Sequence, residues 1–289
     1  MISRQLKKIY EKTNQFSGNR LDILKTTFAT FTNTYASQAA ASLAYYAIFS
    51  LFPLLLVLVA GGSYFLDREE AYEIVTRLVQ NALPVSTQVI NENLSQVVEA
   101  RDAVGIIGLL ALLWSASGFF TILALNINLA WPGAVQRGFL AKRLVGLGMI
   151  AGLVLLFVLA VIMEGVTNLI PFSAPEDASN LELDLWWLFS SLGSWLTVFL
   201  MYLALYRWVP TVPVRWEASL WSALTASLAW KLVTSGFSWY LQSFGRYQLV
   251  YGSLGTIVAW LFLIFIMSQI TLFGAHLSAA INQWMMSRQ

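Results

Sequence analysis

Residues 144–163 read LVGLGMIAGLVLLFVLAVIM, a run without a single charged side chain. A helix needs about 20 consecutive apolar residues to cross the hydrocarbon core of a bilayer, and this run has that length. Five further apolar stretches flank it, and no soluble core requires six of them. They cover residues 38–66, 104–130, 185–206, 217–240 and 252–280. The sequence therefore predicts an all-α polytopic membrane protein with a bundle of six transmembrane helices.

The composition agrees with this fold class and leaves little room for a second domain. Hydrophobic residues make up 58% of the 289 residues and charged residues 11%, whereas about 25% of a typical soluble domain is charged. We expect a cytoplasmic amphipathic or juxtamembrane segment at residues 1–35. A six-helix membrane domain follows at 36–284, and residues 285–289 form a cytoplasmic tail.

Several classes of function find no support in the composition. Cysteine is absent, which excludes disulfides and cysteine-based metal or redox sites. The single histidine, His276, cannot by itself build a His-rich metal site, so we expect neither a metal nor a cofactor. The net charge of +2 gives no reason to expect nucleic-acid binding.

Lys and Arg are distributed unevenly over the loops that join the predicted spans. Twelve of the seventeen fall on one side of the membrane and four on the other, while Lys231 lies within a span. Because cytoplasmic loops carry an excess of Lys and Arg, the richer side is predicted to be cytoplasmic and to hold both termini. Its loops include four cations that could attract anionic lipid headgroups. These are Arg137, Lys142, Arg143 and Arg207.

Two segments outside the spans have helical patterns. Residues 1–35 alternate basic and apolar positions, which fits either an amphipathic helix on the inner leaflet or a solvated tail. Residues 67–103 carry two apolar stripes at helical spacing, interrupted by Pro84. We expect this segment to form an outer, periplasmic helical hairpin, either a lid over a cavity or a structural cover.

Irregularities inside the spans mark places where a cavity could lie. Pro53 is expected to kink the first span, and Ser115 and Ser117 place small polar groups in the second. Gly252 begins the sixth. Small residues in spans serve close helix packing in most cases; beside a kinked helix they can also line a cavity.

Ionisable residues at membrane depth are costly and are functional candidates by default. Glu164 and Lys231 fall at comparable depths in the outer half of the bilayer. They either meet in the bundle interior or lie apart, with Lys231 extended towards the interface. His276 lies near the inner end of the last span as a helix-end histidine or a pH sensor, with Asn126 and Asn128 as expected polar partners.

Four pieces of sequence carry a resemblance to a known family. They are ASLAYYAIFSLFP at residues 41–53, WSASG at 114–118 with Leu125-Asn126, Tyr247 with YGSLG at 251–255, and Gly274-Ala275. Together they resemble the YihY/BrkB family of bacterial inner-membrane proteins, once misnamed ribonuclease BN. The resemblance covers roughly residues 28–284 and implies six spans, cytoplasmic termini and location in the bacterial inner membrane. The family usually has an acid where this chain has His276, which puts any role for a carboxylate there in doubt.

Three functions are compatible with these features. The first is transport or flipping of an amphipathic envelope molecule, a lipid or a lipopolysaccharide-related precursor, through a polar cavity; without a GxxxxGK[ST] loop it would be passive, ion-coupled or partner-dependent. The second is a non-catalytic scaffold or assembly factor for envelope biogenesis. The third, a membrane nuclease or hydrolase, is disfavoured because clustered carboxylates and an activated nucleophile are not evident, so we expect no enzyme.

Membrane lipids are the expected partners, with a homo-oligomer or an envelope-assembly partner also compatible with the sequence. The candidate cavity residues combine the span irregularities with the motif residues. They are Tyr45, Tyr46, Ser50, Pro53, Ser115, Ser117, Asn126, Glu164, Lys231, Tyr247, Tyr251, Gly252 and His276.

Overall fold

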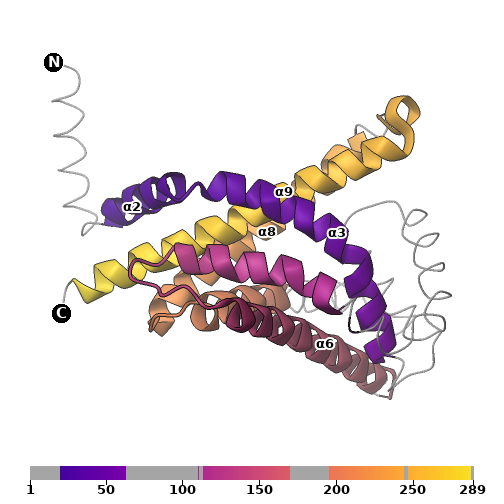
Figure 1. Cartoon of the computed structure of the whole chain (residues 1–289). Helices are drawn as coiled ribbons and strands as arrows, with labels where there is room; N and C mark the ends of the chain where they lie inside the picture. Colours follow the sequence, from indigo (N-terminus) through magenta and orange to yellow (C-terminus); the bar gives the residue numbers. More distant parts are fainter. Residues whose placement is uncertain (1–19, 63–109, 111–112, 170–194, 244–246, 288–289) are drawn as a thin grey trace, which may run out of the picture.

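The computed structural model describes residues 20–62, 110, 113–169, 195–243 and 247–287, and their regular secondary structure is entirely helical (Figure 1). Among these residues, side chains are described for 21–50, 110, 113–152, 154–155, 195–240 and 258–287. The labelled helices are α2 (Arg20–Asn33), α3 (Ala36–Gly62), α6 (Phe139–Leu169), α8 (Trp216–Ser243) and α9 (Tyr247–Met286). Two further helices cover residues 113–129 and 195–208.

The corner between α2 and α3 depends on Tyr35. This residue has φ = 54°, a left-handed conformation that is uncommon for residues other than glycine. Its carbonyl oxygen accepts hydrogen bonds from the amides of Gln38 and Ala39, at 3.0 and 3.1 Å, and these bonds start α3. The two helices therefore meet at a fixed bend.

Helix α9 is the central element of the described part. It packs against α2, α3 and α8, and Figure 1 shows it running past α2 and α3 along much of its length. The common core joins Leu43 of α3, Ile127, Tyr202 and Tyr206 of the two shorter helices, and Leu272 of α9. Many of the remaining core positions are alanine, which lets helix backbones approach closely, as in helical membrane proteins.

Helix α6 packs against helix 113–129 through a glycine. A Cβ atom at Gly146 would lie 2.7 Å from Thr121 Oγ1 and 2.9 Å from the Ser117 carbonyl oxygen, so no larger residue fits there. Ala116, Phe120 and Ile150 form a small buried cluster beside this contact.

The described residues contain one helix that is long and apolar enough to cross a membrane. It is Val258–Met286, with 29 residues and a mean hydropathy of 2.0; Leu113–Leu129 is apolar but shorter. The helical fold class is thus confirmed for the described residues, while the number of spans stays a prediction. The expected hairpin at 67–103 and residues 1–19 of the expected N-terminal segment lie outside the described residues.

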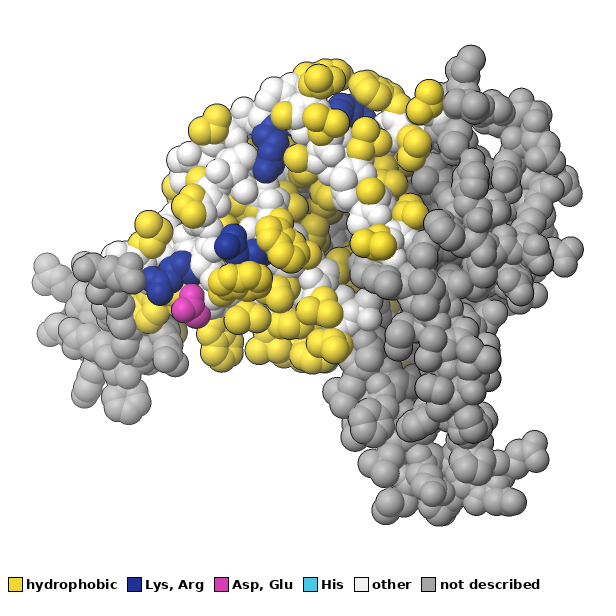
Figure 2. Space-filling view, turned by 90° about the horizontal axis from the view of Figure 1, so that it is seen from below, with side chains coloured by type: hydrophobic (Ala, Val, Ile, Leu, Met, Phe, Trp, Pro, Cys, Tyr) yellow, Lys and Arg dark blue, Asp and Glu magenta, His cyan; other side chains and the backbone are white. Residues whose placement is uncertain are grey.

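Large apolar side chains are exposed on the helices. Leu232 is 75% exposed, Trp208 67%, Trp221 59% and Phe28 59%. Figure 2 shows the same mixture on one face, where yellow hydrophobic side chains surround separate dark-blue Lys and Arg side chains. So many exposed large apolar side chains suit contact with lipid.

Candidate functional site

A row of polar side chains is buried along α9. Its members are Ser268, Thr271, His276, Ser278 and Asn282, all less than 9% exposed. They lie within the helix that meets the criteria for a membrane span. Because hydrocarbon offers no hydrogen bonds, polar groups at such depth must find partners within the protein or line a hydrated cavity.

His276 finds its partners on α2. Its Nε2 lies 3.1 Å from Thr34 Oγ1 and its Nδ1 lies 3.2 Å from Thr30 Oγ1. The ring of Phe31 meets the imidazole edge-on, with centroids 5.7 Å apart. His276 therefore fastens α2 to α9.

The prediction that Asn126 and Asn128 are the polar partners of His276 was wrong. Asn126 Nδ2 donates to the Ile122 carbonyl oxygen one turn back in its own helix, at 2.9 Å. Asn128 bonds to the Val135 carbonyl oxygen and to the Thr211 amide. The contact of His276 with α2 leaves no local pattern in the sequence, because Thr30 and His276 lie 246 positions apart.

Two buried tyrosines form hydrogen bonds with Thr271. Tyr206 Oη donates to the Thr271 carbonyl oxygen at 3.0 Å, and Tyr202 Oη lies 3.3 Å from Thr271 Oγ1. The Tyr206 ring fills the space beside Gly274, where a Cβ atom would collide with its hydroxyl group. Helix 195–208 is thereby fixed against α9.

Asn128 connects two loops. Its Oδ1 accepts hydrogen bonds from the amide and the hydroxyl of Thr211, at 2.8 and 3.0 Å. Its Nδ2 donates to the Val135 carbonyl oxygen at 3.2 Å. That oxygen is also a second acceptor within reach of the single Thr211 hydroxyl proton, at 3.2 Å from Oγ1. The loop after helix 113–129 and the loop before α8 are thus tied at one buried amide.

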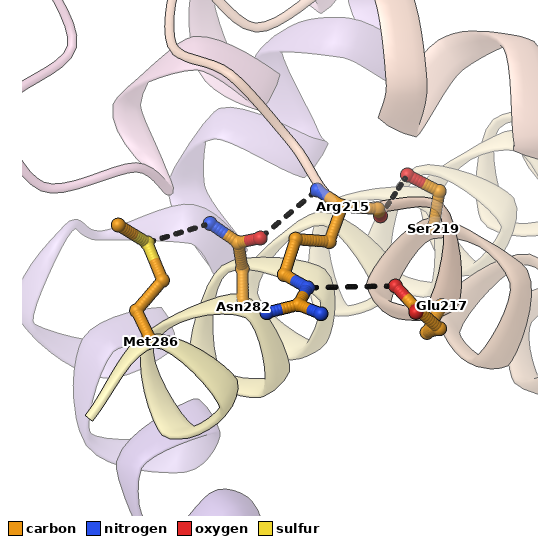
Figure 3. A network of polar contacts seen from close by, with 5 residues as sticks. All are labelled: Arg215, Glu217, Ser219, Asn282 and Met286. Atoms are coloured by element: carbon orange, nitrogen blue, oxygen red, sulfur yellow. Dashed lines mark hydrogen bonds and ion pairs between the residues drawn. The ribbon is translucent and has the colours of Figure 1, made fainter. Parts of the chain in front are cut away.

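Asn282 connects the loop before α8 to the end of α9 (Figure 3). Its Oδ1 accepts from the Arg215 amide at 3.0 Å, and its Nδ2 lies 3.7 Å from Met286 Sδ. The Arg215 side chain forms an ion pair with Glu217 at 3.5 Å; both are well exposed, so this pair contributes little stability. Through Asn128 and Asn282, the two basic loops and the last turns of α9 share one end of the molecule, called here the basic end.

Two arginines of the predicted headgroup set contact aromatic rings. Arg143 Nη1 donates to Ser117 Oγ at 2.8 Å and to the Trp114 carbonyl oxygen at 3.1 Å, and its guanidinium lies 4.4 Å from the centroid of the Trp114 ring. Arg207 lies over the Trp216 ring at 5.1 Å. Such cation–π contacts orient the guanidinium groups beside the indoles.

The other two cations line a small hollow. Arg137 and Lys142 border a space of about 10 Å³ together with Thr121 and Asn128, which is room for one water molecule. Lys142 Nζ donates to Gln136 Oε1 at 3.4 Å.

The predicted cavity residues divide between exposed and buried positions. Tyr45 and Tyr46 are exposed on α3, as are Ser115 on helix 113–129 and Lys231 on α8. Ser50 and Ser117 are buried and donate to carbonyl oxygens of their own helices. The remaining predicted residues have side chains outside the described residues, so the expected pairing of Glu164 with Lys231 stays a prediction. They are Pro53, Glu164, Tyr247, Tyr251 and Gly252.

An apolar groove, here called the α2–α8–α9 groove, was not predicted. It encloses about 270 Å³. Phe31 of α2, Ala226 and Ala229 of α8, and Ile270, Phe273 and Gly274 of α9 form its walls. The small residues at 226 and 229 were the available signal, but only the tertiary contact of three helices makes them a groove.

The helical fold, the exposed apolar surface and the buried polar row are those of a helical membrane protein. The chain belongs to the Virulence factor BrkB family, which it matches over residues 27–289. The resemblance drawn from the sequence motifs is thereby confirmed.

Curated relatives cover most of the chain. The "Putative ribonuclease-like protein YfkH" of Bacillus subtilis (strain 168) is 24% identical over 91% of this chain and 96% of its own length. A "UPF0761 membrane protein" of Tolumonas auensis is 28% identical over 86% of this chain and 82% of its own length. A "UPF0761 membrane protein NTHI0384" of Haemophilus influenzae is 25% identical over 88% and 92%. No solved structure matches the chain.

Proposed function

We propose that this chain is a multi-pass protein of the bacterial inner membrane that moves an amphipathic envelope molecule, a lipid or a lipopolysaccharide-related precursor, between leaflets. Its six spans would place both termini and the basic end in the cytoplasm. Movement of such a molecule requires polar contacts for the headgroup and apolar contacts for the chains at the same depth.

The observation that carries this proposal is that α9 has polar and apolar side chains at the same depth. Its polar row runs from Ser268 to Asn282, and Ile270 and Phe273 of the same stretch border the α2–α8–α9 groove. Polar groups inside a membrane helix are costly, and those of α9 bond to neighbouring elements in this structure. Separation of these elements would offer polar groups to a headgroup beside an apolar groove for the chain.

The basic end would serve as the entry for an anionic headgroup. Arg137, Lys142 and Arg207 lie in or beside its loops, which the ties at Asn128 and Asn282 hold together. Arg143 instead bonds to Trp114 and Ser117, near the other end of helix 113–129. Each Lys or Arg near an anionic lipid surface contributes about 1 kcal/mol of attraction. Lys231, which is exposed on α8, would contribute a cation to the path itself.

The direct test is transbilayer movement of fluorescent lipid in proteoliposomes. Wild-type protein is expected to move phosphatidylglycerol or a lipopolysaccharide precursor well above the rate of empty liposomes. Lys231→Ala is expected to slow this movement, whereas Leu232→Ala, a change at the neighbouring exposed position of α8, is expected not to. Circular dichroism and gel filtration establish that both variants are folded.

The charge of the headgroup provides a second arm. Arg137→Gln with Lys142→Gln removes two cations, which at about 1 kcal/mol each lowers the apparent affinity for anionic lipid about tenfold to thirtyfold. A zwitterionic lipid should be affected much less. Wild-type protein that moves no lipid, with and without a proton or sodium gradient, would contradict the proposal and favour the scaffold function.

A further inference from the structure

We infer that the α2–α8–α9 groove is a binding site for one hydrocarbon chain of a membrane lipid. The inference rests on the membrane location that the family shows, and it deepens the proposed function by placing the apolar part of an amphipathic molecule.

The groove exists because small residues face large ones. Ala226 and Ala229 are three apart on α8 and therefore lie on one face of that helix. Opposite them, Phe31 and Phe273 meet edge-to-face with centroids 5.8 Å apart and form a rigid wall. No side chain can be introduced at Gly274, because Tyr206 occupies the space that it would need.

The chemistry of the groove excludes water as its natural filling. Apart from Thr225 and Gln269, its lining residues have only apolar side chains or none. Gln269 Nε2 donates to Ser37 Oγ at 2.7 Å, so its amide group is engaged with α3. Large apolar cavities stay dry, and one of roughly 150 Å³ accepts benzene; the 270 Å³ here accommodates a longer hydrocarbon.

The groove lies at the depth of lipid chains relative to the basic end. Thr225 is nine residues beyond Trp216, the first residue of α8, and Gly274 is eight residues before Asn282. At 1.5 Å per residue, the groove begins about 12 to 14 Å from the basic end. A hydrocarbon core is about 30 Å thick, so the groove faces the chains of the leaflet whose headgroups meet the basic end.

The volume of the groove favours a lipid chain over a protein helix. An α-helix with its side chains is about 10 Å wide, so one turn of it occupies about 400 Å³. That volume exceeds the 270 Å³ of the groove. A helix from a second copy of this chain could insert only single side chains, whereas one hydrocarbon chain fits along the groove.

The test uses phosphatidylglycerol with a diazirine on one acyl chain, in nanodiscs that contain the full-length protein. We expect photolabel at Phe31, Ile270 and Phe273, mapped by peptide mass spectrometry. Ala229→Phe fills the groove and is expected to reduce this labelling about tenfold, a loss that corresponds to about 1.4 kcal/mol of binding free energy. Leu228→Phe, at the adjacent exposed position, is the matched control and should leave labelling unchanged.

Even labelling of all exposed apolar positions, unaffected by Ala229→Phe, would overturn the inference. So would cross-links between two copies from a cysteine at position 270. If Ala229→Phe fails to fold, Ile270→Ala enlarges the groove instead. Labelling of the remaining wall residues should then rise, and an unchanged yield would count against the site.

The outcome separates this inference from the proposed function. Labelling that disappears in Ala229→Phe, while lipid movement continues at the wild-type rate, supports the chain site and removes it from the transport path. Labelling in a wild-type protein that moves no lipid supports the chain site and contradicts transport. Loss of both labelling and lipid movement in Ala229→Phe supports the chain site and the transport function together.

Discussion

At the scale of single residues, position 274 accepts only glycine because of one neighbour. A Cβ atom there would lie 2.7 Å from Tyr206 Cζ. We expect Gly274→Ala to destabilise the protein by about 1–3 kcal/mol, the usual cost of overpacking, measured as thermal unfolding in detergent. Gly148→Ala on α6, where a Cβ atom meets nothing within 4 Å, should be neutral or stabilise by up to about 1 kcal/mol. Equal effects of the two changes would refute this account of Gly274.

His276 holds a helix rather than a ligand in this structure. Replacement of Thr30 and Thr34 by valine removes both hydroxyl partners and leaves a buried imidazole, which costs about 1–3 kcal/mol. We expect faster hydrogen exchange of the α2 amides in this variant, followed by mass spectrometry. Thr32→Val serves as the control, because the exposed Thr32 hydroxyl bonds only to the Phe28 carbonyl oxygen of its own helix. Unchanged exchange in the double variant would show that α2 does not depend on the histidine.

At the scale of elements, one buried amide positions two loops. Asn128→Leu removes the acceptor of the Thr211 amide and hydroxyl, whereas Asn126→Leu removes only a bond within its own helix. Because the chain lacks cysteine, a cysteine at Val135 and another at the exposed Pro213 report the distance between the loops and leave Thr211 intact, through bifunctional cross-linkers of graded length. We expect short cross-linkers to react efficiently in the Asn126→Leu background and poorly in the Asn128→Leu background. Equal efficiency would mean that other contacts hold the loops.

The sequence predicted the elements better than their contacts. Apolar runs predicted helices at 38–66 and 144–163. Helix α3 covers most of the first run, and α6 covers all of the second. The partners of His276 could not be predicted in this way, because Thr30 lies 246 positions away in the sequence. Thr211 likewise lies 83 positions from Asn128. Periodicity identifies which residues share a helix face, while only packing identifies which faces meet.

The same limit applies to the candidate site. The cations of the basic end followed from a count of Lys and Arg in the loops, and the buried His276 followed from its position in an apolar run. The groove could not be predicted from the sequence, because Phe31, Ala229 and Phe273 belong to three different helices. The contact of Arg143 with Trp114 and Ser117 could not be predicted either, because it requires α6 to pack beside helix 113–129.

At the scale of the whole molecule, the distribution of charge and apolar surface describes a protein oriented in a bilayer. The loops tied by Asn128 and Asn282 gather Arg137, Arg207 and Arg215 at one end, and exposed leucine and tryptophan side chains cover the helices beyond it. Cytoplasmic loops are enriched in such cations. We therefore expect the basic end, with the last turns of α9, to face the cytoplasm.

The measurement that tests this claim most directly is the accessibility of single cysteines to a membrane-impermeant maleimide. Three variants suffice, with cysteine at the exposed Val135, at the exposed Met286, or at Ser86 in the predicted outer loop 67–103. The account predicts that only the Ser86 variant reacts in intact spheroplasts, and that the Val135 and Met286 variants react in inside-out vesicles. Reaction of the Val135 or Met286 variant from the outside would contradict the orientation and, with it, the proposed entry of lipid headgroups at the basic end.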